Sequence, residues 1–71
     1  MQVRIDQEAD AVYINLTDHG IEDSEEVADG IIVDYDATGN IVGVEILDAS
    51  QKTGDPNTLR QLSFDLPRLA A

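Results

Sequence analysis

The sequence predicts a small α+β protein, an antiparallel β-meander of three or four strands followed by a short C-terminal helix or strap. Three observations predict it: β-branched residues alternate with polar ones in the first 50 residues, turn formers separate these runs, and a helix-start pair follows them. With 71 residues, the chain is predicted to form a single domain, 1–71. Residues 1–50 are expected to form the sheet and 51–71 the helical segment or strap.

The first hairpin is predicted from two short alternating runs. Residues 3–5 alternate around an arginine, and residues 11–17 place Val12, Ile14 and Leu16 on one side. The polar cluster between these runs has the composition of a turn.

Residues 18–26, DHGIEDSEE, have little periodicity and are rich in acids and turn formers. This composition predicts a mobile connecting loop, with Val27 beginning the next strand.

The second hairpin is predicted from residues 31–36 and 41–47, with the turn at residues 37–40. Burial selects the register, because a slip by one residue would mix aspartates into the apolar face. The expected pairs on that face are Tyr35 with Val42, Val33 with Val44, and Ile31 with Ile46.

The opposite face of this hairpin is mixed in character. It carries acidic residues together with Ile32, Ile41 and Leu47, which predicts partial cover by the tail or by another subunit.

Three carboxylates of this hairpin, Asp34, Asp36 and Glu45, are candidate ligands for a divalent cation. Their spacing resembles part of an EF-hand loop, but both flanks have the two-residue period of a strand, which argues against an EF-hand. In the predicted register Asp34 lies opposite Gly43 and diagonal to Glu45, so the two carboxylates can converge on one cation or one guanidinium. The simpler alternative is a solvated acidic face.

In the tail, Asp55 and Pro56 form a suitable N-cap and first helical residue, which predicts a helix of about two turns. Residues 52–55 are the expected linker. Pro67 disfavours helix before it, so Phe64, Leu66 and Leu69 are expected to form an irregular or extended apolar strap.

The formal net charge is −11, and it is unevenly distributed. Residues 1–48 hold 13 acids and one base, while residues 49–71 hold two acids and three bases. Such a charge repels nucleic acid and anionic membranes and favours a basic protein partner, although ordinary solubility is an alternative explanation. The absence of cysteine excludes disulfides, and a core this small favours a homodimer.

No catalytic constellation is apparent, and we expect neither an enzyme nor a cofactor. His19 has no second nitrogen at ligand spacing, and the serines have no base at a recognisable spacing. An acidic run is a candidate docking site, with a solvated loop as the alternative; its residues are Glu22, Asp23, Glu25 and Glu26.

Two segments carry a resemblance to a known family. Residues 5–14 and 30–50, above all the block VGVEILDAS, resemble domain of unknown function 2283 (DUF2283), a family of short prokaryotic proteins. The resemblance implies a small antiparallel sheet and brings no established activity or catalytic residues. Proteins of this kind look like those encoded beside toxin-like partners, which implies an antitoxin-like role.

The sequence thus predicts a soluble, cytoplasmic, non-enzymatic interaction module. The alternative is a divalent-cation-binding domain that uses the hairpin carboxylates.

Overall fold

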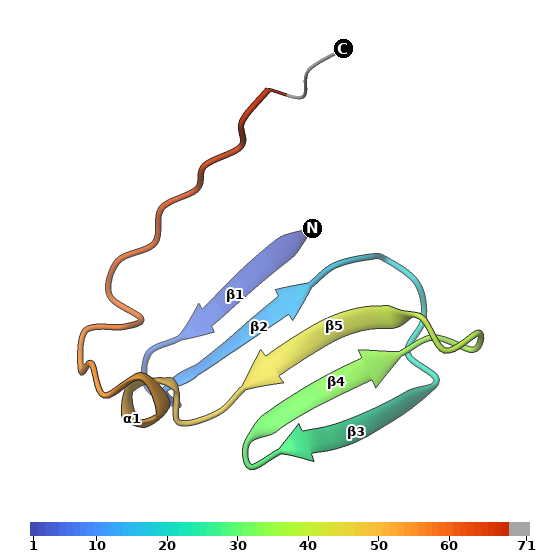
Figure 1. The fold of residues 1–71 in the computed structure, drawn as a ribbon, viewed down its shortest axis with the longest axis horizontal. Coiled ribbons are helices and arrows are strands. Elements are labelled where there is room, and N and C mark those ends of the chain that lie inside the picture. The colour runs from blue at the N-terminus through green and yellow to red at the C-terminus, as the bar shows by residue number, and fades with distance from the viewer. Residues whose placement is uncertain (69–71) are drawn as a thin grey trace.

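The computed structural model describes residues 1–68, and in this part the chain forms a five-stranded antiparallel sheet and one short helix. The strands lie in the order β1-β2-β5-β4-β3, as Figure 1 shows. The predicted α+β class is confirmed. The predicted three- or four-stranded meander is wrong, because the sheet has one more strand and β2 pairs with β5 rather than with β3.

The first hairpin, β1 (Gln2–Asp6) and β2 (Ala11–Asn15), forms as predicted. Val3 pairs with Ile14, so these apolar side chains share one face of the sheet. The turn is closed by the Asp6 carboxylate, which accepts a hydrogen bond from the Ala9 amide at 3.0 Å.

The second hairpin, β4 (Ile31–Tyr35) and β5 (Ile41–Ile46), confirms two of the three predicted apolar pairs, at Ile31 and at Val33. The third is wrong, because Tyr35 lies opposite Ile41 and Val42 is left in a bulge.

The hairpin turn explains this shift. The Asp36 amide donates to the Asn40 carbonyl at 2.9 Å, so only residues 37–39 form the loop, with Gly39 at a φ of 85°. Asn40 therefore occupies the position that we expected for Ile41, and the bulge restores the register further along the strand.

The predicted mobile loop at residues 18–26 is wrong over its second half, where β3 (Asp23–Ala28) forms one edge of the sheet. All six residues of β3 are exposed, so no alternation of buried side chains marks them as a strand. Main-chain pairing with β4 holds the strand in place. Val27 lies at an irregularity within β3 rather than at the start of the next strand.

The helix occurs earlier in the chain than predicted. Helix α1 (Ala49–Thr53) follows β5 directly, so half of the expected linker at residues 52–55 is helical. The Asp55 carboxylate accepts from the Asn57 amide at 2.9 Å, but residues 56–60 form only turns. The predicted helix at this position is therefore wrong.

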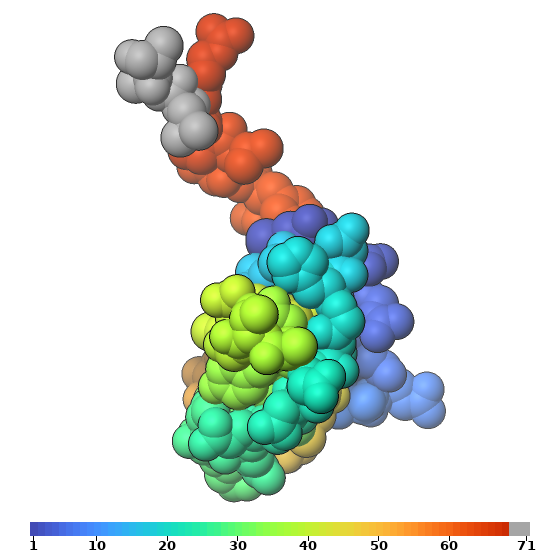
Figure 2. Space-filling view, turned by 90° about the vertical axis from the view of Figure 1, so that its right-hand side faces the viewer, coloured from blue at the N-terminus to red at the C-terminus, as the bar shows by residue number. Residues whose placement is uncertain are grey.

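The tail, residues 61–68, has no regular secondary structure and runs away from the sheet, as the orange-red chain in Figures 1 and 2 shows. Phe64 is 72% exposed and Leu66 is 95% exposed, so these two residues of the expected apolar strap are largely exposed to solvent. Leu69 lies outside the described residues. Within residues 1–68, no helix is long and apolar enough to cross a membrane.

Candidate functional site

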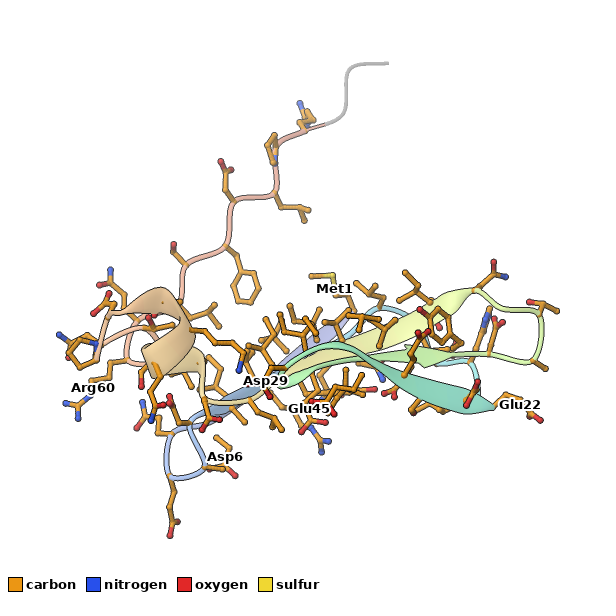
Figure 3. The ribbon with its side chains drawn as sticks, turned by 60° about the horizontal axis from the view of Figure 1, so that its bottom comes forward. Met1, Asp6, Glu22, Asp29, Glu45 and Arg60 are labelled. Carbon is orange, nitrogen blue, oxygen red and sulfur yellow. The ribbon has the colours of Figure 1, made fainter. Side chains whose placement is uncertain are left out.

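The sheet is a single layer with two unlike faces. Figure 3 views it almost edge-on, with Met1 on the upper side and Asp6 and Glu45 on the lower side. All five strands belong to one hydrogen-bonded sheet, so they form one layer of backbone with side chains on both sides. Each face is a separate candidate for function.

The upper face is apolar and only partly covered. Its side chains come from four neighbouring strands and are Val3, Ile5, Val12, Ile14, Ile31, Val33, Val44 and Ile46. All but Val33 stay at an intermediate exposure. Among residues 1–68, the buried apolar residues are Val33, Val42 and Ala49. Such a face is typical of a sheet that packs against a second layer.

The lower face holds a buried carboxylate, that of Asp34, which is 8% exposed. It accepts hydrogen bonds from the Tyr13 hydroxyl at 2.9 Å and from the Ser24 hydroxyl at 2.5 Å. Three strands, β2, β3 and β4, therefore meet at one side chain. Because both donors are satisfied within the protein, this cluster serves to join the strands.

Gly43 makes this cluster possible. A Cβ at this position would lie 2.5 Å from the Tyr13 hydroxyl and 3.0 Å from the Ile14 carbonyl oxygen. The missing side chain lets the Tyr13 ring cross β5 and reach Asp34. Arg4 stacks on the same ring, with 5.8 Å between its guanidinium carbon and the ring centroid.

Burial of the Tyr13 ring raises the pKa of its hydroxyl, and the hydrogen bond to the Asp34 carboxylate raises it further. The hydroxyl is therefore a hydrogen-bond donor rather than a proton-transfer group at neutral pH.

Asp36 organises the turn between β4 and β5. Its Oδ1 accepts from the Thr38 and Asn40 amides, both at 2.9 Å, and its Oδ2 lies 3.2 Å from Nδ1 of His19. The hydrogen bonds from Asn40 and Thr38 lower the pKa of Asp36 to about 2. His19, for which the sequence offered no second nitrogen at ligand spacing, is exposed and contacts this carboxylate.

The three carboxylates predicted as cation ligands have separate environments. Asp34 accepts from Tyr13 and Ser24, and Asp36 accepts from its own turn. Glu45 lies opposite Tyr13 and Ile32 in the sheet. Over residues 1–68, no three acidic, histidine or cysteine side chains lie close enough together to hold a metal ion. Cation binding stays a prediction of the sequence, and no geometric observation favours it.

The residues predicted for interaction lie in two places. Ile32 and Leu47 are half-buried, whereas Ile41 is 47% exposed beside the bulge in β5. The acidic run lies on or beside the edge strand β3, and all its members are exposed; they are Glu22, Asp23, Glu25 and Glu26. The run is therefore part of an ordered strand rather than a loop.

Sequence reasoning missed the anchor between the first turn and α1. The Asp10 carboxylate accepts hydrogen bonds from the Ser50 hydroxyl at 2.7 Å and from the Ser50 amide at 3.1 Å. Asp10 adopts a φ of 55°, a left-handed conformation that aspartate tolerates better than most residues. An aspartate at a turn was the only available signal, and it does not reveal a partner 40 residues away.

The fold and its two faces define a class of small, single-layer antiparallel sheet proteins with one partly covered apolar face. The chain belongs to the family described as "Protein of unknown function (DUF2283)", whose model matches residues 2–50. This confirms the predicted family resemblance. The matched segment comprises the whole sheet and ends at Ser50, the residue that Asp10 holds. No curated protein and no solved structure matches the chain.

Proposed function

We propose that this protein is a non-enzymatic protein-interaction module. The observation that supports the proposal is the apolar face, which draws side chains from four strands and is packed against no second layer in residues 1–68. A contiguous apolar surface that the protein itself covers only in part marks a site of protein contact. An antitoxin-like role is one form that such a module takes, and a cytoplasmic location stays a prediction of the sequence.

The charge of the module favours a basic partner. Residues 1–48 hold 13 acids and one base, and the exposed edge strand β3 carries three of these acids, Asp23, Glu25 and Glu26. A surface of one sign speeds encounter with a partner of the opposite sign and makes binding salt-dependent.

The proposal is tested with the full chain as bait in an extract of its source cells, with bound proteins identified by mass spectrometry. One variant, Glu22→Gln with Glu26→Gln, removes two charges at β3 while keeping an acceptor oxygen at position 26 for the Gly30 amide. The matched control, Glu8→Gln with Asp18→Asn, removes two exposed charges elsewhere.

We expect a basic protein that is retained by the native chain and by the control, that elutes as salt rises, and that is lost with the β3 variant. Equal retention by both variants, or retention that salt does not weaken, contradicts the proposal.

A further inference from the structure

We propose that the apolar face packs against the same face of a second copy of this chain, forming a two-layer β-sandwich in which each tail reaches the partner's β3. This inference rests on the proposed function, since it names the partner that covers one surface of the module. Three features of the molecule support this arrangement: the shape of the sheet, the placement of its charges and the course of the tail.

Within residues 1–68 the apolar face lacks a second layer. A sheet with one apolar face is stable when that face is covered, and domains are built from at least two layers. Helix α1 is five residues long and lies at the end of the sheet, where Leu59 and Leu62 line a hollow with Ile5 and Val12. The rest of the face has no covering layer within residues 1–68. A second sheet of the same kind covers such a face at a separation of about 10 Å.

The acids at one margin of the face determine how the two sheets align. By their register with β4, Asp23 and Glu25 share the apolar face, and both lie on its β3 margin. The opposite margin, β1, carries Val3 and Ile5. A two-fold axis across the strands would stack β3 on β3 and bring four carboxylates together, which is unfavourable. An axis along the strands instead places β1 over the partner's β3.

The course of the tail fits the same alignment. Residues 61–68 run beyond the β1 edge in Figure 1 and rise on the apolar side in Figure 3. With the axis along the strands, this is where the partner's acidic β3 lies. Arg60, next to the tail, and Arg68, within it, are both exposed, so they complement the acids of that strand.

The area of the apolar face limits the size of the interface between the two sheets. Five strands about 4.8 Å apart, each about five residues long, make a face of about 24 by 17 Å, or about 400 Å² in projection. A stable interface buries about 800 Å² on each partner. The face alone therefore gives a small interface, and the exposed Leu62, Phe64 and Leu66 of the tail supply additional apolar surface.

The first experiment measures the mass of the full chain in solution by sedimentation. The chain has a mass of 7.7 kDa, so we expect twice that value, 15.4 kDa. A species of 7.7 kDa overturns the proposal. A monomer whose own tail covers the apolar face is one form of that outcome.

The second experiment uses two neighbouring isoleucines as a matched pair. Ile31 lies on the apolar face and Ile32 on the opposite face, and both are half-buried. We expect Ile31→Lys to raise the dissociation constant of the dimer by at least about 30-fold, because a charge then faces the apolar side chains of the partner. Ile32→Lys should leave it nearly unchanged, and equal effects of the two changes contradict the arrangement.

The third experiment avoids variants that fail to fold and tests the axis directly. The chain has no cysteine, so Val44→Cys and Glu25→Cys each introduce a single thiol. With a cross-linker too short to reach from β1 to β3, whose centres lie about 19 Å apart, Val44→Cys on the central strand should give a covalent dimer and Glu25→Cys should not. Cross-linking through Glu25→Cys, or none through Val44→Cys, overturns the arrangement.

These results are separable from those for the proposed function. A monomer that still captures a basic partner through β3 refutes the sandwich and leaves the interaction module standing. A dimer that captures no such partner refutes the basic partner and leaves the sandwich standing.

Discussion

At the scale of single residues, two carboxylates only two positions apart have different roles, Asp34 within β4 and Asp36 just after its end. Asp34 is buried and ties three strands together through two hydroxyl groups, whereas Asp36 folds the adjacent turn. The sequence predicted that both lie on the second hairpin but grouped them as cation ligands. Their hydrogen-bond partners could not be foreseen, because Ser24 lies on a strand that the sequence does not reveal and Tyr13 reaches Asp34 only across a glycine.

Gly43→Ala is expected to destabilise the protein by about 1–3 kcal/mol, because the new methyl group displaces the Tyr13 hydroxyl and leaves Asp34 buried with one donor fewer. Chemical denaturation measures the loss. Gly20→Ala is the control, since a Cβ at Gly20 meets nothing within 4 Å. Equal stability of the two variants would show that Tyr13 does not depend on the space above Gly43.

The Tyr13 hydroxyl is expected to ionise above the ordinary pKa of 10.0, because burial and the Asp34 carboxylate both disfavour its anion. The raised pKa contributes stability that is fully present below pH 10 and is lost as pH rises through the pKa of the folded state. Ultraviolet titration measures this ionisation. In Asp34→Asn the transition should move to lower pH, and an unchanged transition would contradict the assigned cause.

The lowered pKa of Asp36 predicts acid sensitivity at the turn. Its folded-state pKa of about 2 lies below the ordinary 3.8, so its contribution is present above pH 3.8 and is lost as pH falls toward 2. Asp36→Asn should therefore lower the melting temperature at pH 7, with a difference that shrinks as pH falls through this window. Thermal melts at several pH values check this, and a difference that is constant with pH argues against it.

At the scale of elements, the sequence predicted the four strands that place apolar side chains on one face. It did not predict the edge strand β3 or the position of the helix. Alternating Val and Ile residues marked four strands, because their side chains pack on one face of the sheet. Strand β3 gave no such signal, since its six residues are exposed and its stability comes from pairing with β4. Asp55 and Pro56 are suited to begin a helix, but of the described residues that follow only Thr58 and Leu59 are partly buried, and only turns form there.

The anchor of α1 gives a prediction at this scale. Ser50→Ala removes the hydroxyl that donates to Asp10 at 2.7 Å and should cost about 1 kcal/mol. Amide hydrogen exchange in α1 should accelerate, while exchange in the central strand β5 stays slow. Gln51→Ala, at an exposed neighbouring position, is the control. Exchange that accelerates equally in both variants would mean that Asp10 does not hold the helix.

At the scale of the whole molecule, the net charge predicts opposite effects of salt on the stability of the protein and on its binding to a basic partner. The net charge of −11 on one small sheet repels itself, and salt screens this repulsion. Added sodium chloride should therefore raise the melting temperature of the protein alone, whereas it should weaken capture of a basic partner. A melting temperature that falls with salt would indicate that attractive ion pairs outweigh the repulsion.

The bond between Asp10 and Ser50 fastens the last residue of the family segment to its first turn. All five strands lie before Ser50, so every residue after it joins a sheet whose strands are already paired. Changes of length or composition beyond Ser50 therefore leave both partners of this bond and every paired strand unaltered in sequence.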